Sequence, residues 1–283
     1  MAKILEKREL TPVTKLFRVD APLVAQAAQP GQFVIVRVRE GGERIPLTIA
    51  DYDRDAGTLT IVVQEVGTTT QYLGALEIGD EILDLVGPLG MAIDLPAGGH
   101  VVGIGGGFGA AALLCMMREL SQRGDRTTVI IGARNESLLI LRDELASVCD
   151  NLELCTDDGS VGYKGLVTGR LGELMQGDAA ERPDRVVAIG PMPMMRAVAE
   201  TTRDAAIPTL VSLDPLMIDG TGMCGGCRVS VNNEIKFACV DGPLFDAHQV
   251  DFEEAVRRNK MYVKQEQASK ERASCRSLAV GQN

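Results

Sequence analysis

The sequence predicts a β-barrel, then an α/β domain with a doubly wound parallel sheet, and finally a small module with clustered cysteines. Three observations predict this order. Short β-prone segments fill residues 1–97, separated by Pro-Gly, Gly-Gly and Asp-rich breaks, as in small barrels. From residue 98 onward, buried strands alternate with helices. Three of the seven cysteines then fall between residues 224 and 239. The expected divisions are 1–97, 98–212, 213–250 and 251–283.

The expected elements of the barrel share a β-prone composition between turn residues. The strands are "TKLFRVDAP", "GQFVIVRVRE", "PLTIADYD", "TLTIVVQEV" and "DEILDLVGPLG". One short helix is expected in "TTTQYLGALEIGD", closed by Gly79.

The α/β domain is expected to alternate regularly. Its strands are "HVVGIGGG", "RTTVIIGAR", "NLELCTDDG", "DRVVAIGP" and "PTLVSLDP". The helices between them are "FGAAALLCMMRELSQRG", "LLILRDELASVC", "GLVTGRLGELM" and "MPMMRAVAETTRDAA". Alternation at this spacing is typical of a doubly wound parallel sheet. After the cysteine module, a charged helix and a polar tail are expected.

The composition narrows the classes of partner. The formal net charge is −10 at pH 7, which opposes binding to nucleic acid or to an anionic membrane. No apolar run reaches the roughly 20 residues that a membrane helix needs, and the amino-terminal residues lack the apolar core of a signal peptide. We therefore expect a cytoplasmic protein without membrane insertion. In that compartment cysteines more often bind metal than form disulfides. Four scattered cysteines are expected to be packing residues (Cys115, Cys149, Cys155) or a tail thiol (Cys275).

A glycine loop, "GIGGGFGAAALL" (103–114), follows a strand and opens a helix. Glycines there let the backbone approach a pyrophosphate, which the free N–H groups of the helix start can bind. "AIGPMPMM" ends a later strand of the same sheet, and ligands of open α/β sheets lie at such strand ends. A tight turn without a ligand is the alternative. The candidate nucleotide-binding residues are Gly105, Gly106, Gly107, Gly109, Gly190, Pro191 and Met192.

Two segments of the barrel suggest a second ligand. In "RIPLTIAD", Pro46 and Leu47 can face a flat ring, and the backbone of residues 47–49 can bond its edge. In "GTTT", a glycine turn and three hydroxyls suit a pair of phosphates. Taken singly, each segment is also common in ordinary β structure. The candidate residues are Arg44, Pro46, Leu47, Thr48, Gly67, Thr68, Thr69 and Thr70.

Residues 3–210 resemble the ferredoxin–NADP reductase superfamily, in which a barrel is followed by a domain with "GGGFG" and later "GPMPMM". The resemblance implies that the barrel binds a flavin, FAD, and that the second domain binds NAD(P)H. That superfamily usually has an arginine three residues before the Ser/Thr of its flavin strand. Here Ile45 takes that position, and Arg44 stands one place earlier.

The charged residues alone do not decide whether the domain prefers NAD(H) or NADP(H). "GARNESLLILRDEL" holds Arg134 and Arg142, which could bind a 2′-phosphate, and Glu136 and Glu144, which would repel one. The family resemblance favours NAD(H), with NADP(H) as the alternative.

The cysteine module resembles the electron-transfer subunit of dihydroorotate dehydrogenase, whose four cysteines hold a [2Fe–2S] cluster. This chain has Cys224, Cys227 and Cys239 in the matching register, and Asp219 where the first cysteine stands. The implied metal ligands are Asp219, Cys224, Cys227 and Cys239. A carboxylate is a harder ligand than a thiolate, yet can hold ferric iron. A zinc site, or a cluster with another fourth ligand while Asp219 caps a turn, are the alternatives.

"GERIPLTIAD" and "DPLMIDGTGMCGGCR" further resemble the small subunits of NADH-dependent reduced ferredoxin:NADP oxidoreductases. That resemblance implies a larger partner with FAD and [4Fe–4S] clusters, and indirect exchange with ferredoxin by electron bifurcation. NADH would pass hydride to the flavin, and the cluster would take single electrons; no protein residue is named as catalytic. A dihydroorotate dehydrogenase-like or hydrogenase-like partner, or a redox-sensing module without catalysis, are the alternatives.

Overall fold

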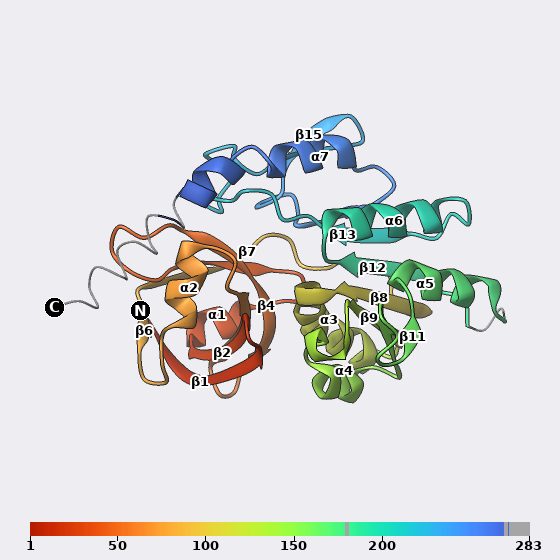
Figure 1. The fold of residues 1–283 in the computed structure, drawn as a ribbon, viewed down its shortest axis with the longest axis horizontal. Coiled ribbons are helices and arrows are strands. Elements are labelled where there is room, and N and C mark those ends of the chain that lie inside the picture. The colour runs from red at the N-terminus through yellow and green to blue at the C-terminus, as the bar shows by residue number, and fades with distance from the viewer. Residues whose placement is uncertain (179–180, 269–270, 272–283) are drawn as a thin grey trace.

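The computed structural model describes residues 1–178, 181–268 and 271. The barrel and the α/β domain lie side by side, and the carboxyl-terminal module lies across both of them (Figure 1). This arrangement confirms the predicted fold class. The division at 97/98, 212/213 and 250/251 stays a prediction, and Cys275 lies outside the described residues.

The barrel is a seven-stranded antiparallel sheet in the order β6-β1-β2-β5-β4-β3-β7, which curls until it is nearly closed. Its buried centre contains large apolar side chains that alternate along the strands, among them Phe17, Ile49 and Ile61. The elements are β1 (Ala2–Thr11), β2 (Thr14–Asp20), α1 (Pro22–Ala27), β3 (Phe33–Arg37), β4 (Ile45–Asp53), β5 (Thr58–Gln64), α2 (Thr68–Gly74), β6 (Glu81–Ile82) and β7 (Asp84–Leu89).

The α/β domain has a sheet in the order β11-β10-β9-β8-β12-β13-β16, parallel except at its last strand. Chain order reverses between β8 and β12, which is where such sheets form a ligand crevice. The elements are β8 (His100–Gly106), α3 (Ala110–Gln122), β9 (Arg126–Ala133), α4 (Arg142–Val148), β10 (Asn151–Thr156), β11 (Tyr163–Lys164), α5 (Val167–Gln176), β12 (Arg185–Ile189), α6 (Met192–Arg203) and β13 (Thr209–Ser212). Short 3₁₀ turns cover Gly107–Gly109 and Glu136–Leu138.

Helix α3 joins the two domains. Most of its side chains are buried, as expected of a helix that is apolar on nearly every face. One side packs on the sheet, and the other shares a core with barrel residues Leu16, Ala50 and Val62. The thiol of Cys115 on this helix donates a hydrogen bond to the Ile49 carbonyl of β4, at 3.3 Å. The barrel and the nucleotide loop are therefore held in a fixed relation.

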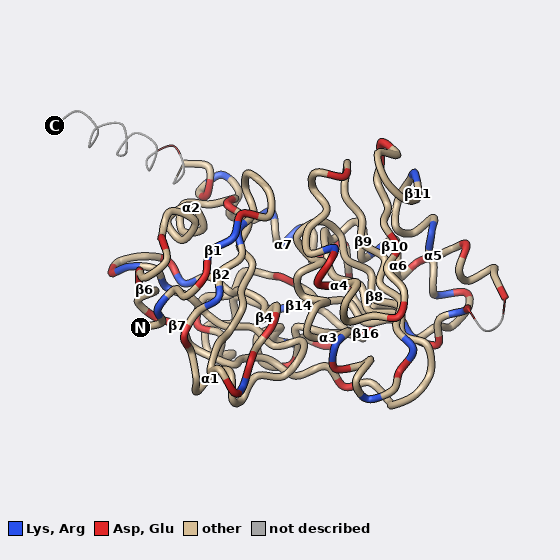
Figure 2. Tube along the Cα trace, turned by 90° about the horizontal axis from the view of Figure 1, so that it is seen from below, with Lys and Arg blue, Asp and Glu red and all other residues tan. Residues whose placement is uncertain are grey.

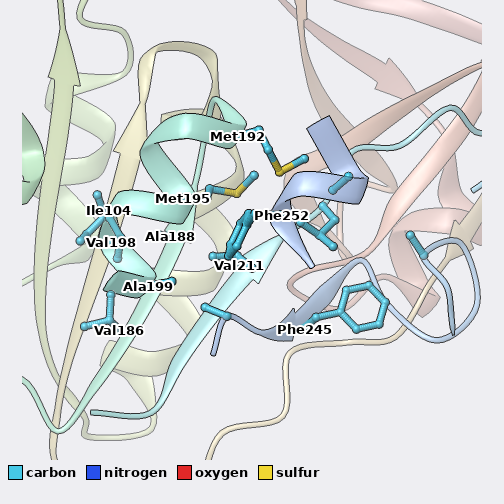
Figure 3. Packing of buried hydrophobic residues seen from close by; sticks show 14 of the residues in the cluster. Ile104, Val186, Ala188, Met192, Met195, Val198, Ala199, Val211, Phe245 and Phe252 are labelled. Carbon is cyan, nitrogen blue, oxygen red and sulfur yellow. The ribbon is translucent and has the colours of Figure 1, made fainter. Parts of the chain in front are cut away.

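The module is tied to the α/β sheet through its own apolar residues. β16 (Leu244–Asp246) pairs antiparallel with β13, so the module supplies the last strand of that sheet. β14 (Arg228–Val231) and β15 (Glu234–Phe237) form a hairpin, and α7 (Phe252–Asn259) follows. Phe245 and Phe252 belong to the same buried cluster as Met195 and Val211, and the Phe252 ring lies beside Met195 and Val211 (Figure 3). The cysteine module therefore shares a hydrophobic core with the nucleotide domain.

Charged residues of both signs are interspersed along the chain (Figure 2). Over the described residues, every helix is too short or too polar to span a bilayer. The cytoplasmic location expected from the sequence stays a prediction.

Candidate functional site

The glycine loop after β8 packs tightly on the turn after β12. A Cβ on Gly106 would lie 2.4 Å from Sδ of Met194 and 2.9 Å from Cδ of Pro191. A Cβ on Gly109 would lie 2.1 Å from the Ile189 carbonyl oxygen. The close approach of the two turns therefore requires these glycines, whatever ligand the loop binds.

Gly107 has a different reason to be glycine. Its φ is +52°, and a Cβ there would meet no atom within 4 Å. It lies on the wall of a cavity of about 360 Å³ between the barrel and the α/β domain. The cavity is at the carboxyl ends of the parallel strands, the position at which open α/β sheets bind ligands. The sequence therefore provides open backbone where a ligand can approach.

The predicted nucleotide residues divide between the cavity wall and the packing behind it. Gly106, Gly107 and Pro191 line the cavity. Gly105 lies in β8 and packs against Ala110, Gly190 lies in the packed turn after β12, and Met192 is buried in the core. Sequence reasoning missed lining residues whose place depends on the domain interface, namely Thr11, Val13, Thr14 and Gln64. Nothing in their local sequence signals this position.

Among the described residues that line the cavity, two are charged: Arg134 after β9 and Asp157 after β10. The N–H of Asp158 donates to the Arg134 carbonyl at 3.2 Å, so the two strand ends lie side by side. The other charged side chains discussed for nucleotide preference form ion pairs, Arg142 with Glu136 and Glu144 with Arg8. The cavity therefore offers one positive and one negative group to a ribose or a phosphate.

The predicted flavin strand lies at the start of β4. Pro46 is opposite Ile35 of β3, and Leu47 is opposite Val34. Leu47 is buried in the barrel core, so its backbone, rather than its side chain, is available to a ligand. Pro46 and Thr48 face the other way, because strand residues alternate. Arg44 is exposed just before the strand.

The threonine turn after β5 leaves one hydroxyl without a partner. Thr70 Oγ accepts the Gly67 N–H and donates to the Gly67 carbonyl, both at 2.9 Å. Thr69 donates to Glu43 Oε2 at 2.9 Å. Thr68 Oγ is buried without a hydrogen-bond partner in the described structure. A buried orphan hydroxyl at this turn is consistent with a polar ligand group that would complete it.

Two of the predicted metal ligands are adjacent. Cys227 and Cys239 are buried, and their sulfur atoms are 3.2 Å apart. Burial, followed by the contact with Cys227, raises the pKa of the Cys239 thiol to about 12. Metal binding is what converts such a thiol into a thiolate. The pair therefore supplies two adjacent sulfur donors for a metal-thiolate site.

The other two predicted ligands lie on the loop before this pair. Asp219 accepts the N–H of Thr221 at 2.8 Å and the N–H of Cys224 at 2.7 Å. The bond from the Thr221 N–H contributes most to lowering the pKa of the Asp219 carboxyl. Cys224 is exposed, and its sulfur accepts the Gly226 N–H at 3.5 Å. Asp219 thus caps the turn in this structure, as one alternative interpretation expects.

The donor set fits an iron–sulfur cluster in its chemistry and its loop. Across the described residues, no three His, Cys, Asp or Glu side chains converge into a metal-binding group. Three thiols and a carboxylate are nevertheless gathered on one short segment and its neighbour. Gly220, Gly222 and Gly225 all have positive φ, which lets the loop turn sharply between ligands. Soft thiolates are the ligands that iron–sulfur clusters use.

The cluster loop rests directly on the barrel. A Cβ on Gly220 would lie 2.8 Å from Leu89 of β7 and 2.9 Å from Ile35 of β3. Because Ile35 is opposite Pro46 in the sheet, one strand separates the cluster loop from the predicted flavin strand. The structure therefore brings the predicted flavin strand and the cluster loop together, although Pro46 and Asp219 are more than 170 residues apart in sequence.

Two family profiles match the chain. An oxidoreductase FAD-binding domain matches residues 1–101. The iron–sulfur cluster binding domain of dihydroorotate dehydrogenase B matches residues 214–251. These matches confirm the predicted FAD and iron–sulfur cofactors, and NAD(H) binding fits this fold.

Relatives match over nearly the whole chain. The dihydroorotate dehydrogenase B (NAD(+)) electron transfer subunit homolog of Thermotoga maritima is 43% identical and covers 95% of this chain and 94% of the relative. The corresponding electron transfer subunit of Desulforamulus reducens is 34% identical, with 89% and 98% covered. A chain in the solved structure of the NADH-dependent reduced ferredoxin-NADP oxidoreductase, reported for flavin-based electron bifurcation, has a TM-score of 0.90. It is 42% identical and covers 96% of this chain and 97% of that chain.

Identity at this level, over this share of each chain, extends to all three parts of the molecule. The barrel, the α/β domain and the cysteine module therefore occur together in the relatives as they do here. The chain belongs to the flavin and iron–sulfur oxidoreductase family of dihydroorotate dehydrogenase B electron-transfer subunits and their homologues.

Proposed function

We propose that the chain binds FAD and a [2Fe–2S] cluster, exchanges hydride with NAD(H), and exchanges single electrons with a larger flavin and iron–sulfur subunit. The complex is of the bifurcating ferredoxin:NADP oxidoreductase type. The observation that carries the proposal is a series of neighbouring strands that joins the two ends of the path. Gln64 of β5 lines the cavity, β5 pairs with β4, β4 pairs with β3, and the cluster loop packs on Ile35 of β3. Electron transfer between cofactors requires this kind of proximity.

The nucleotide is held by the α/β domain. The open backbone at Gly107 lies where the pyrophosphate can approach, and Arg134 and Asp157 lie where the ribose can be bound. We assign the cavity to NAD(H), because the relatives above are named for NAD(+) or NADH. Asp157 would offset the attraction of Arg134 for a 2′-phosphate, and Arg142 is already paired with Glu136. Hydride transfer needs no protein acid or base, so no residue is assigned as catalytic.

The flavin is held by the barrel. Pro46, Thr48 and the backbone of Leu47 would hold its ring. The Thr68 hydroxyl, which has no partner in the described structure, would donate a hydrogen bond to its phosphates. The nearby Glu43 carboxylate engages Thr69 and keeps that hydroxyl away from the ligand.

The cluster is held by Asp219, Cys224, Cys227 and Cys239. When bound, the flavin accepts a hydride as an electron pair and the cluster carries the electrons one at a time. To bind iron, the Asp219 carboxylate would either leave the N–H groups of Thr221 and Cys224 or keep these hydrogen bonds while it binds the metal. Such hydrogen bonds to cluster ligands adjust the reduction potential.

The larger subunit would dock over the cluster loop. Large apolar side chains are exposed on the segment just before Cys224, with Met223 88% exposed, Ile218 49% and Leu216 44%. Exposed apolar patches of this kind mark protein interfaces. A partner seated there would cover the exposed ligand Cys224 and receive electrons at short range.

A dihydroorotate dehydrogenase is the second candidate for the partner, because the two relatives above are named after the electron transfer subunit of that enzyme. The resemblance of "DPLMIDGTGMCGGCR", which contains Asp219, and the structural match at a TM-score of 0.90 favour the ferredoxin-linked complex. Co-purification of the native complex distinguishes the two, since the larger subunit can be identified directly.

The test of the proposed function is cofactor analysis of the full chain purified without oxygen. We expect released FAD, equal amounts of iron and sulfide, and bleaching of the flavin absorbance when NADH is added. A colourless protein, or bound flavin that NADH does not reduce, would contradict the proposal and favour a sensing module.

A further inference from the structure

The end of helix α7 lies against the cluster loop. The guanidinium of Arg258 donates a hydrogen bond to the Gly226 carbonyl at 3.3 Å. Gly226 immediately precedes Cys227 and lies within the segment that carries two proposed ligands. The carboxylate of Asp251 accepts the Glu254 N–H at 2.8 Å and begins the helix, whose side chains at Phe252 and Ala255 are buried. The position of Arg258 is therefore set by a packed helix.

The same guanidinium is only partly satisfied. Its Nε is buried and has no hydrogen-bond partner among the described residues, and no carboxylate there lies within ion-pair distance of Arg258. Burying a charged donor without a partner costs free energy, so such a group usually indicates a missing acceptor. Arg257, the preceding residue on the helix, is exposed. One of two adjacent arginines thus faces the loop of the cysteines.

We propose that Arg258 is a positioning residue for the iron–sulfur cluster and that its charge raises the cluster's reduction potential. The inference rests on the proposed ligand set of Cys224, Cys227 and Cys239 with Asp219. The guanidinium holds the loop through the Gly226 carbonyl, and places a positive charge beside anionic ligands. One-electron reduction adds negative charge to the cluster, so a nearby cation stabilises the reduced form.

The experiment compares three variants of the full chain by redox titration followed by electron paramagnetic resonance (EPR). Arg258→Gln removes the charge, Arg258→Lys keeps it, and Arg257→Gln removes an equal charge from the exposed neighbour. For Arg258→Gln we expect the ratio of reduced to oxidised cluster at a fixed potential to fall about tenfold, a shift of about 59 mV for a one-electron couple. The cluster potential of Arg258→Lys should stay close to the wild-type value because the charge is kept, and that of Arg257→Gln should also stay near the wild-type value.

Equal shifts in Arg258→Gln and Arg257→Gln would overturn the inference, because general surface charge would then explain them. A wild-type potential in Arg258→Gln would also overturn it and leave Arg258 a purely structural role. If Arg258→Gln does not retain a cluster, Arg258→Lys decides: a retained cluster near the wild-type potential supports the charge, and loss of the cluster contradicts it. A wild-type chain with no iron–sulfur signal would instead refute the proposed function.

Discussion

Replacement of Gly107 by alanine tests the nucleotide site. A Cβ at this position meets no atom within 4 Å, so the substitution causes no clash. Its φ of +52° is left-handed, which costs an alanine about 1–2 kcal/mol of unfolding free energy. For a chain of this size that corresponds to a fall in melting temperature of roughly 2–8 °C.

The effect on nucleotide binding is expected to exceed the effect on stability. A methyl group on the cavity wall would hold the pyrophosphate away from the backbone. Loss of one hydrogen bond to a charged group costs about 1.5–3 kcal/mol, or roughly a 10- to 150-fold rise in the dissociation constant for NADH. Isothermal titration calorimetry measures that constant, and thermal unfolding measures the stability.

Gly124→Ala is the matched control. Gly124 has a φ of +90°, also meets no atom within 4 Å, and ends helix α3 far from the cavity lining. It should lose at least as much stability as Gly107→Ala while keeping the wild-type affinity for NADH. If Gly107→Ala binds NADH as tightly as this control does, the cavity is not the nucleotide site.

Three further predictions follow from buried or cavity-lining groups. Thr68→Val should release FAD, because it removes the hydroxyl that lacks a partner, whereas Thr70→Val should retain more flavin because Thr70 already bonds Gly67. The flavin content of the purified variants measures this, and equal retention would contradict the role of Thr68. Asp157→Asn should raise the affinity for NADPH about tenfold, by removing a charge that repels a 2′-phosphate, and unchanged binding would contradict the assignment. Burial lowers the pKa of His100 below its ordinary value of 6.5, so the unfolded chain binds more protons in this range than the folded chain does. The melting temperature should therefore fall as the pH drops below about 6.5. His100→Gln should flatten that dependence, and an unchanged slope would refute the prediction.

Much of the fold can be predicted from hydrophobic pattern and turn residues. The alternation of strands and helices from residue 98 appears in the structure, because each segment is long and strongly patterned. β1 is the main omission. Its inward Ala2 and Ile4 flank the charged Lys3, and Lys7 further along is ion-paired with Glu77 in the turn before β6. Pairing partners far along the chain stabilise this strand, and a local pattern does not show them.

The helix after the threonine turn shows how packing sets a boundary. The sequence predicts closure at Gly79, whereas α2 ends at Gly74. A Cβ on Gly74 would lie 1.8 Å from the Glu65 carboxylate, which pairs with Lys15. The need for glycine at this position comes from the side chain of Glu65, which directly follows β5, so the local sequence does not show it.

The candidate site divides in the same way. Ligand spacing in the cysteine module can be read from sequence, because a motif fixes it. The pairing of β16 with β13, which attaches that module to the nucleotide domain, depends on contacts between distant segments. So does the position of Gly220 on Ile35, which brings the two proposed redox sites together.

The central claim is that electrons from NADH reach a cluster that Asp219 helps to ligate. The most direct measurement is the EPR spectrum of the full chain, frozen without oxygen after reduction by NADH, for the wild type and for Asp219→Cys. We predict a reduced [2Fe–2S] signal in both, with a changed spectrum and potential in Asp219→Cys, because a thiolate would replace a carboxylate on the iron. Identical spectra and potentials would show that Asp219 only caps the turn, and the absence of any NADH-induced signal would contradict the claim as a whole.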